Sequence, residues 1–196
     1  MAFSSIMEEL GSLAPSFSLS NTNPNAGKPV VSLEDFTGSP ALLVAFICNH
    51  CPYVIHIRES FSVFAAEYQG RGLGVVAICS NDVTTHPDDG PEKMTAEAVG
   101  HGFPFPYLHD EAQDVAKAYR AACTPDFFLY DDALRLVYRG QYDASRPNND
   151  APIDGHALRA ATDEVLGGQA ITANQIPSMG CNIKWKSGQE PDYFPS

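Results

Sequence analysis

The fold of this chain is decided by the stretch Ala41-Leu42-Leu43-Val44-Ala45-Phe46-Ile47-Cys48-Asn49-His50-Cys51-Pro52. Its first seven residues are all apolar, which is typical of a β-strand that is buried on both faces. After Pro52 the apolar residues recur at helical spacing until Gly70 and Gly72: Tyr53, Ile57, Phe61, Phe64, Ala65 and Tyr68. The tetrad Cys48 to Cys51 is therefore expected where a buried strand hands over to the N-terminus of a helix.

This position gives the two cysteines of the tetrad a chemical meaning. Backbone N–H groups and the helix dipole favour negative charge at a helix N-terminus, so the first cysteine, Cys48, is expected to become a thiolate near neutral pH. A Cys-x-x-Cys pair alone also makes half a zinc site. Strand, tetrad and helix together are more specific, and they indicate dithiol redox chemistry at Cys48 and Cys51.

Composition predicts one compact, soluble, intracellular domain. A chain of 196 residues that is 44% hydrophobic can bury a sizeable core without disulfides. Its five cysteines are odd in number and irregularly spaced, which argues against a secreted disulfide framework. The stretch from Met1 to Ser12 has no Lys or Arg and no long apolar core, so we expect no signal peptide and a cytoplasmic location.

Two classes of partner are disfavoured. The longest apolar run, Ala41 to Ile47, is too short to span a membrane. A net charge of −12 works against binding to nucleic acid or to anionic lipid surfaces. We therefore expect neither a nucleic acid nor a membrane as partner.

Other segments complete an α/β pattern. Gly74 to Cys79 is a second buried strand, which with the first strand and the helix makes a right-handed βαβ unit. Phe127 to Tyr130 and Leu134 to Tyr138 are expected to form a β-hairpin. The remaining expectations are an edge segment at 13–19, a helix at 92–101, an irregular approach to a short strand at 103–108, a helix through 115–119 that is capped by Asp110 and Gln113, and a last helix from about 154 to 166.

Taken in order, these elements resemble the thioredoxin fold. More narrowly, they resemble the redoxin branch that includes the alkyl hydroperoxide reductase and thiol-specific antioxidant (AhpC/TSA) proteins. Three segments carry this resemblance: Gly11 to Leu19, Cys48 to Tyr53 and Cys123 to Leu129. The closing segment, Gly180 to Trp185, resembles the tail of bacterial thioredoxin-like members. The resemblance implies a central mixed β-sheet flanked by helices, with an N-terminal β extension. It implies a single redoxin domain over residues 1–196, with a C-terminal extension at 169–196.

The resemblance also assigns roles within the tetrad. Cys48 is expected to be the exposed nucleophile that attacks a disulfide, and Cys51 to resolve the mixed disulfide that forms. As an imidazolium, His50 would stabilise the Cys48 thiolate and make the disulfide more oxidising; the alternative is a solvated loop histidine. Asn49 and Pro52 complete the expected substrate-binding surface, although Pro52 also fits a purely structural role early in the helix.

Thr124 and Pro125 resemble the cis-proline segment that faces the dithiol in this fold. There the backbone of the residue before the proline pairs with an extended substrate, so both residues are expected to bind substrate. From the sequence alone an X-Pro bond is expected to be trans, since cis makes up only about 5% of such bonds. The cis geometry is implied by the resemblance.

This sequence departs from two patterns of its relatives. Thioredoxins carry a buried carboxylate in the central strand, but here Leu42 occupies that position, so proton transfer to Cys51 needs water, His50 or a group from elsewhere. Peroxidatic redoxins place a proline and a threonine seven and three residues before their catalytic cysteine. With Cys51 as that cysteine, those places hold Val44 and Cys48, which weakens a peroxidase interpretation.

The other cysteines are given different roles. Cys79 ends a buried strand and is expected to be an inert core thiol. Alternation along an extended segment turns Cys123 away from the dithiol. Cys181 lies in a polar, glycine-flanked tail and is expected to be accessible. We hypothesise that Cys181 exchanges with the site or closes a disulfide with Cys123.

A metal interpretation draws on Cys48, Cys51, His50 and His56. Copper-delivering redoxin relatives use a spacing one residue longer and a distant histidine, so we predict no metal site and no cofactor. The pairs Asp88-Asp89 and Asp131-Asp132 look like solvated turn residues with no catalytic role.

The sequence thus predicts a thiol-disulfide oxidoreductase that cycles Cys48 and Cys51 and serves redox homeostasis as an antioxidant protein. Its expected partners are protein or small-molecule disulfides, or hydroperoxides, together with an unidentified thiol electron donor. One alternative is a thiol peroxidase that uses Cys51 or Cys48. Another is a metal-binding or redox-sensing module without turnover.

Overall fold

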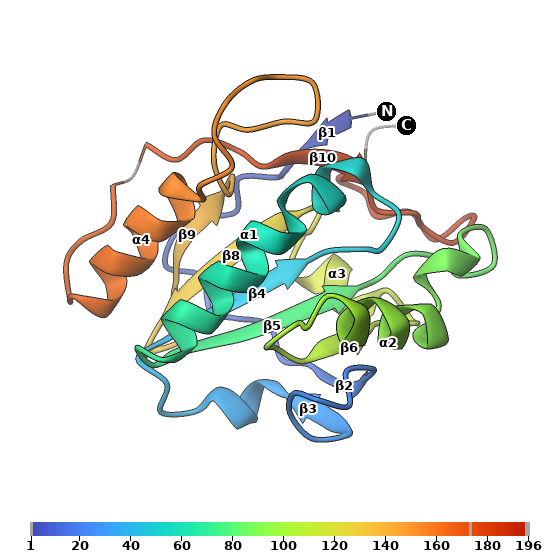
Figure 1. Cartoon of the computed structure of the whole chain (residues 1–196), viewed down its shortest axis with the longest axis horizontal. Coiled ribbons are helices and arrows are strands. Elements are labelled where there is room, and N and C mark those ends of the chain that lie inside the picture. Colours follow the sequence, from blue (N-terminus) through green and yellow to red (C-terminus); the bar gives the residue numbers. More distant parts are fainter. Residues whose placement is uncertain (1, 173, 195–196) are drawn as a thin grey trace.

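In the computed structural model, which describes residues 2–172 and 174–194, the apolar run forms the centre of the fold (Figure 1). It becomes strand β4 (Ala41–Phe46), in which every residue is buried. Helix α1 (Pro52–Gln69) follows, and β5 (Leu73–Cys79) then returns parallel to β4. The predicted βαβ unit is therefore confirmed, and the tetrad lies between the C-terminal end of β4 and the N-terminus of α1.

The remaining strands extend this unit into a seven-stranded mixed sheet of order β3-β2-β6-β5-β4-β8-β9. On one side, β6 (Tyr107–His109) is parallel to β5, and β2 (Ser18–Asn21) and β3 (Val30–Ser32) close the edge. On the other side, β8 (Asp126–Asp131) is antiparallel to β4 and forms the predicted hairpin with β9 (Leu136–Gly140).

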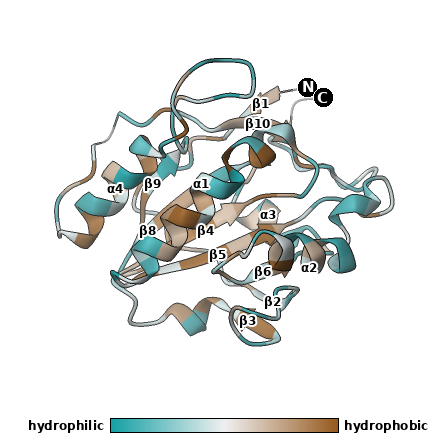
Figure 2. Ribbon diagram, in the orientation of Figure 1, coloured by the Kyte–Doolittle hydropathy of each residue, from teal (hydrophilic) through white to brown (hydrophobic). Residues whose placement is uncertain are grey.

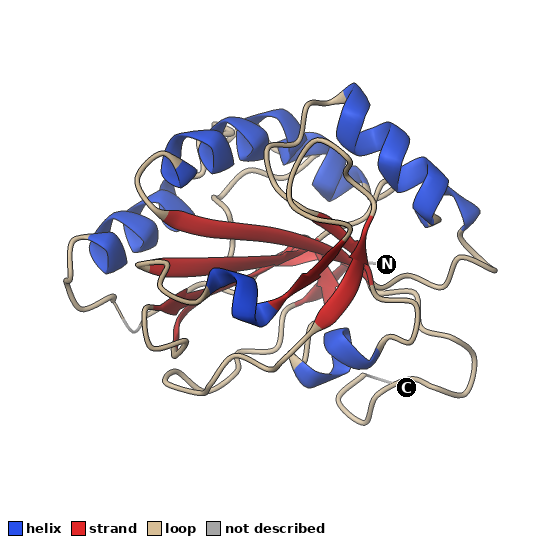
Figure 3. Ribbon diagram, turned by 90° about the horizontal axis from the view of Figure 1, so that it is seen from below, coloured by secondary structure: helices blue, strands red, loops and turns tan. Residues whose placement is uncertain are grey.

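Helices cover both faces of this sheet (Figure 3). One core cluster joins α1 to α2 (Pro91–Gly100) and α4 (His156–Leu166) through residues such as Phe64, Met94 and Leu158. The opposite cluster joins the sheet to the short helix α3 (Asp114–Ala118). Alternation along β4 feeds both clusters, because Leu43 packs on the α1 side and Leu42 on the α3 side. Figure 2 shows the apolar colour concentrated on β4, β5 and the inner side of α1.

The capping prediction for α3 holds for one residue of the pair. Asp110 accepts hydrogen bonds from the backbone amides of Val115 and Ala116, as a carboxylate at a helix start should. Gln113 occupies the N-cap position, but its side chain makes no capping hydrogen bond. Its amide instead donates to the carbonyl oxygens of Ser80 and Lys184. Gln113 thus fastens the C-terminal segment to the end of β5.

A second sheet of three strands has the order β1-β10-β7 and brings both chain ends together. Strand β10 (Met179–Asn182) lies between β1 (Ala2–Ser4) and β7 (Cys123–Thr124), antiparallel to each. The rings of Phe3 and Phe194 stack with their centroids 5.4 Å apart. The C-terminal extension is therefore no loose tail, because its middle part is a paired strand beside the site.

The α/β thioredoxin fold with a central mixed sheet flanked by helices is thus confirmed. Among the described residues, no helix has the length and apolar character that crossing a membrane requires. The single domain over residues 1–196, with its C-terminal extension at 169–196, stays a prediction.

Candidate active site

The tetrad forms the turn between β4 and α1. Ile47 is still tied to the sheet, since its amide donates to the Ile78 carbonyl oxygen at 3.0 Å. Cys51 is the N-cap residue of α1, with extended backbone angles, and Pro52 is the first helical residue, where a missing N–H costs nothing. The N-cap position places Cys51, rather than Cys48, directly at the positive end of the helix dipole.

Both cysteine side chains are held against Thr124. The Cys48 sulfur lies 3.3 Å from Thr124 Oγ1, and the Cys51 sulfur lies 3.1 Å from the Thr124 carbonyl oxygen, to which it donates while it is protonated. Cys48 is 2% exposed and Cys51 is fully buried. The prediction of an exposed Cys48 is therefore wrong, because the tetrad turn packs down onto β7 instead of projecting from the surface.

The pair carries its negative charge on Cys51. Cys48 donates a hydrogen bond to the Cys51 sulfur, and this lowers the pKa of Cys51 to about 5, with help from the Cys181 thiol and from the backbone amides of Val54 and Cys181. The same hydrogen bond, followed by burial and by the nearby charge of Asp89, raises the pKa of Cys48 well above its usual range. The thiolate thus sits on the cysteine that was expected to resolve.

The peptide bond between Thr124 and Pro125 is cis, as the resemblance implied. The expected docking edge is nevertheless taken: Thr124 pairs with Cys181 of β10, and Thr124 is only 2% exposed. An extended substrate therefore cannot pair with Thr124 while β10 is in place. The substrate-binding role of Thr124 and Pro125 stays a prediction, and it requires β10 to move.

Asp89 is not the solvated turn residue that the sequence predicts. It is fully buried, at the end of the short 3-10 helix Pro87–Asp89. Its Oδ1 atom accepts from the Asn49 amide at 2.8 Å, and its Oδ2 atom accepts from Asn81 Nδ2 at 2.7 Å. Oδ2 also lies 2.6 Å from His50 Nδ1, as an ion-pair contact. The tetrad turn is thereby tied to the loop after β5.

The side chains of Asn49 and His50 are used for this connection. Asn49 donates from Nδ2 to the Asp88 carbonyl oxygen at 2.7 Å and accepts from the Tyr107 hydroxyl at 3.0 Å. The His50 ring stacks on that of His86 with centroids 4.9 Å apart. Because its side chain is 28% exposed and faces Asp89, His50 is not a solvated loop histidine, and its role in stabilising a Cys48 thiolate stays a prediction. Pro52 is exposed at the start of α1.

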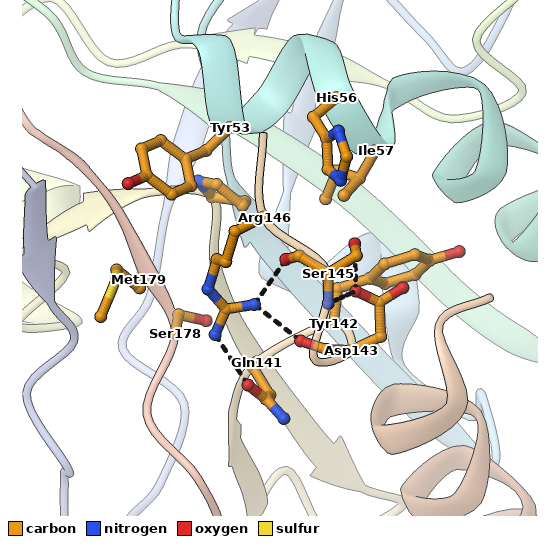
Figure 4. A pocket seen from close by; sticks show the side chains of 11 residues that line it. Tyr53, His56, Ile57, Gln141, Tyr142, Asp143, Ser145, Arg146, Ser178 and Met179 are labelled. Carbon is orange, nitrogen blue, oxygen red and sulfur yellow. Dashed lines mark hydrogen bonds between the residues drawn. The ribbon is translucent and has the colours of Figure 1, made fainter. Parts of the chain in front are cut away.

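A small pocket opens beyond Pro125, between α1 and the loop after β9 (Figure 4). Tyr53 and His56 line it from α1, and Arg146 lines it from the opposite side. The Arg146 guanidinium is fully engaged there, with the carbonyl oxygens of Asp143 and Ser145 and with Gln141 Oε1. His56 thus belongs to this pocket.

The other three cysteines are placed by the two sheets. Cys79 is a buried thiol at the end of β5, as predicted. Cys123 pairs with Asn182 while Cys181 pairs with Thr124. Paired residues share a face and successive residues alternate, so Cys123 and Cys181 lie on opposite faces. The hypothesis of a disulfide between Cys123 and Cys181 is contradicted by this register.

Asp126 is a second buried carboxyl group near the site. It follows Pro125, and its Oδ2 atom accepts from the Ala122 amide at 3.2 Å, while Oδ1 has no hydrogen-bond partner. Burial raises the pKa of Asp126 to about 8. It pairs with Phe46, whose side chain is in the α3-side cluster, so Asp126 lies across the sheet from the dithiol.

Over residues 2–172 and 174–194, one group of side chains is close enough together to supply three ligand atoms to a metal ion: Cys48, His50 and Asp89. One ligand atom from each lies within 4.8 Å of the other two. Thiolate, imidazole and carboxylate are ligands that suit zinc. Cys51 and His56, which the sequence also offered as ligands, are not part of this group.

Comparisons with known proteins point to a redox class. The model of the AhpC/TSA family matches residues 10–139, which include the tetrad and Thr124-Pro125. No curated protein matches the chain. The matched part of the chain contains β2 to β8, all of β9 except its last residue, and α1 to α3. Strands β1 and β10 and helix α4 lie outside it.

Among solved structures, two are similar over nearly the whole chain. An uncharacterized conserved protein from Geobacillus kaustophilus is 49% identical, with a TM-score of 0.92 and coverage of 95% of this chain and 97% of that one. A hypothetical protein from Sinorhizobium meliloti is 51% identical, with a TM-score of 0.90 and coverage of 94% and 99%.

A more distant structure has a functional assignment. It is a Chlorobium tepidum protein assigned as the thiol:disulfide interchange protein DsbE, 22% identical, with a TM-score of 0.60 and coverage of 81% of this chain and 99% of that one. At this identity the likeness shows the fold alone.

Proposed function

The chain belongs to the AhpC/TSA family, and from that premise we propose that it is a thiol-disulfide oxidoreductase that cycles Cys48 and Cys51 between dithiol and disulfide. One observation carries the proposal: where β4 gives way to the N-terminus of α1, both sulfurs are held against Thr124, Cys48 at 3.3 Å from its Oγ1 and Cys51 at 3.1 Å from its carbonyl oxygen. A low-pKa thiolate beside a protonated thiol is the arrangement that both steps of disulfide exchange need.

The reaction follows from these two protonation states. The Cys51 thiolate attacks one sulfur of a substrate disulfide; a bond forms between them, the substrate bond breaks, and the leaving thiolate takes up a proton. Cys48 then loses its proton and attacks the Cys51 sulfur, which releases the second substrate thiol. The chain is oxidised by two electrons and the substrate is reduced by two. A thiol electron donor reverses the sequence.

The proposal reverses the roles that the sequence suggested for the two cysteines. Cys51 receives the helix dipole and the Val54 amide, whereas the buried charge of Asp89 disfavours a thiolate on Cys48. His50 contributes by neutralising Asp89 when it is protonated, and its contact at 2.6 Å supports this. The substrates we propose are protein or small-molecule disulfides in the cytoplasm, because five cysteines at irregular spacing do not form a secreted disulfide framework.

A thiol peroxidase that uses Cys51 is the second candidate. The low pKa of Cys51 and its place before Pro52 favour it, since the thiolate is the form that attacks a hydroperoxide. Its weakness is the residue three positions earlier, which is Cys48 instead of a threonine. The nearest hydroxyl comes from Thr124, and it contacts the Cys48 sulfur at 3.3 Å.

The rates of two reactions decide between these functions. Reduced wild type, Cys48→Ser and Cys51→Ser are mixed separately with glutathione disulfide and with hydrogen peroxide, quenched by alkylation and followed by mass spectrometry. We expect glutathione disulfide to give a Cys48–Cys51 disulfide in wild type and to form its first mixed disulfide at Cys51 in Cys48→Ser. A fast peroxide reaction that survives in Cys48→Ser, with no reaction toward glutathione disulfide, would establish the peroxidase instead.

A further inference from the structure

Strand β10 brings a third cysteine to the dithiol. Residue pairing along β10 and β7 sets Cys181 directly opposite Thr124. Directly opposed residues of an antiparallel pair have their side chains on the same face, with Cβ atoms about 4.5–5.5 Å apart. The Thr124 side chain touches the Cys48 sulfur, so this face is the one that carries the dithiol. The Cys181 side chain therefore points toward Cys48 and Cys51.

A glycine lets β10 approach this closely. A Cβ atom at Gly180 would lie 1.9 Å from the Thr124 carbonyl oxygen, a distance at which the strand could not stay in place. That same carbonyl oxygen accepts the Cys51 thiol at 3.1 Å. Gly180 thus brings the backbone of β10 into contact with the group that also holds Cys51, and it fixes the position of the next residue, Cys181.

Packing and hydrogen bonding agree with this placement. Cys181 is half-buried and packs against the core cluster that contains Cys48 and Cys51. The thiol and the backbone amide of Cys181 both help to lower the pKa of Cys51, which agrees with a Cys181 side chain on the dithiol face. Cys123, the neighbouring cysteine on β7, is on the other face and makes no such contact.

We propose that Cys181 is a third redox cysteine, which attacks the Cys48–Cys51 disulfide at the Cys51 sulfur and forms a Cys51–Cys181 disulfide. This inference rests on the proposed function, because the Cys48–Cys51 disulfide is its starting point. It deepens that function by giving the oxidised chain a second form, in which Cys48 is a free thiol again.

The exchange is balanced within the chain. A bond forms between the sulfurs of Cys181 and Cys51, and the bond between Cys51 and Cys48 breaks. The proton that Cys181 loses is taken up by the leaving thiolate of Cys48, and no oxidant or reductant enters. Burial, and then the hydrogen bond to Cys51, raise the pKa of Cys181 to about 11. Once Cys51 is in a disulfide the second of these causes is gone, which favours deprotonation of Cys181 at that stage.

The test uses the full chain with Cys48 replaced. Reduced Cys48→Ser is treated with glutathione disulfide, and the glutathione that is released and the disulfide peptides are both measured. We expect Cys51 to take up glutathione and Cys181 to displace it, so that two glutathione molecules leave for each Cys51–Cys181 disulfide formed. In Cys48→Ser/Cys181→Ser we expect the second release to be lost and glutathione to stay on Cys51. Cys48→Ser/Cys123→Ser is the matched control, and it should behave like Cys48→Ser.

The outcomes separate the two proposals. If glutathione stays on Cys51 in Cys48→Ser while Cys181 remains a free thiol, the third-cysteine proposal is overturned and the proposed function stands. If Cys51 takes up no glutathione and wild type forms no Cys48–Cys51 disulfide, the proposed function fails and this inference fails with it. Peptide mapping of oxidised wild type needs no variant to fold: a Cys51–Cys181 peptide there supports the proposal, and its absence at neutral and alkaline pH overturns it.

Discussion

Oδ2 of the fully buried Asp89 lies 2.6 Å from Nδ1 of His50, so a residue from the loop after β5 holds the turn that carries the dithiol. The same carboxylate accepts from the Asn49 backbone and from the Asn81 side chain. A buried carboxylate is stable only with such partners. The expected buried acid of a thioredoxin central strand is absent here, and Asp89 reaches the tetrad turn from another segment.

The replacement Asp89→Asn should therefore destabilise the reduced protein. Its side-chain NH₂ group would face a donor, either Asn81 Nδ2 or the Asn49 amide, and leave a buried group unsatisfied. We expect the free energy of unfolding to fall by about 1–3 kcal/mol, measured by urea denaturation. Asp88→Asn is the control, because the Asp88 side chain is exposed and only its backbone carbonyl contacts Asn49. Equal stability of the two variants would contradict the role given to Asp89.

Cys51 should give the reduced protein a thiolate in mildly acidic solution. Its pKa is lowered to about 5, whereas an unfolded cysteine titrates at about 8.5. A lowered folded pKa stabilises the folded state above the unfolded value, and this stabilisation is lost as the pH falls through the folded pKa. We expect thiolate absorbance with a midpoint near this lowered pKa, absent in Cys51→Ser. Between the folded and the unfolded pKa, from about pH 5 to about pH 8.5, the stability of reduced wild type relative to Cys51→Ser should rise with pH. A stability difference between the two proteins that does not change with pH would contradict the thiolate on Cys51.

Gly180→Ala should dislodge β10. The added methyl group would overlap the Thr124 carbonyl oxygen, so the strand must shift. Overpacking of this kind lowers the free energy of unfolding by about 1–3 kcal/mol. We also expect faster alkylation of Cys51, which β10 covers in the wild type, and of Cys181, which is part of β10. Gly100→Ala is the control, since nothing lies within 4 Å of a Cβ atom at that helical position. If both variants match wild type in urea and in alkylation, β10 is not held by the contact at Gly180.

Asp126 should make the protein less stable at high pH. Its pKa is raised to about 8 by burial, so the folded state holds a proton that the unfolded chain loses at about 3.9. A raised folded pKa in an acid gives stability that is present at low pH and is lost as the pH rises through the folded value. Relative to wild type, Asp126→Asn should therefore gain stability from about pH 4 to about pH 8. Asp132→Asn, on the exposed hairpin turn, serves as the control. Parallel pH curves for wild type and Asp126→Asn would refute this.

The parts of the fold that the sequence predicted are those with local causes. The seven apolar residues of 41–47 and the helical spacing after Pro52 predict β4 and α1 without reference to the rest of the chain. Strands β1 and β10 were missed because their pairing joins Ala2–Ser4 to Met179–Asn182, across nearly the whole sequence. Such short strands have too few residues for a period to be visible, and only tertiary pairing defines them.

The site was predicted in its residues more than in its roles. Cys48, Cys51, Thr124 and Pro125 come together as the resemblance implied, including the cis bond. Burial of the dithiol could not be predicted from the sequence, because the residues that cover it come from β7 and β10, far along the chain. Burial of Asp89 depends on its contacts with Asn49, His50 and Asn81, which only the folded chain brings together. The charge on Cys51 has the same origin, since one of its donors is Cys181.

The most direct test of the central claim is an equilibrium redox titration of Cys181→Ser in dithiothreitol buffers, followed by alkylation and peptide mapping. Removing Cys181 leaves Cys48 as the partner of Cys51. The account predicts one reversible two-electron transition, in which the Cys48–Cys51 disulfide appears and disappears as a single species. Cys48 and Cys51 that stay as thiols over the whole range, or a disulfide formed by other cysteines, would contradict it.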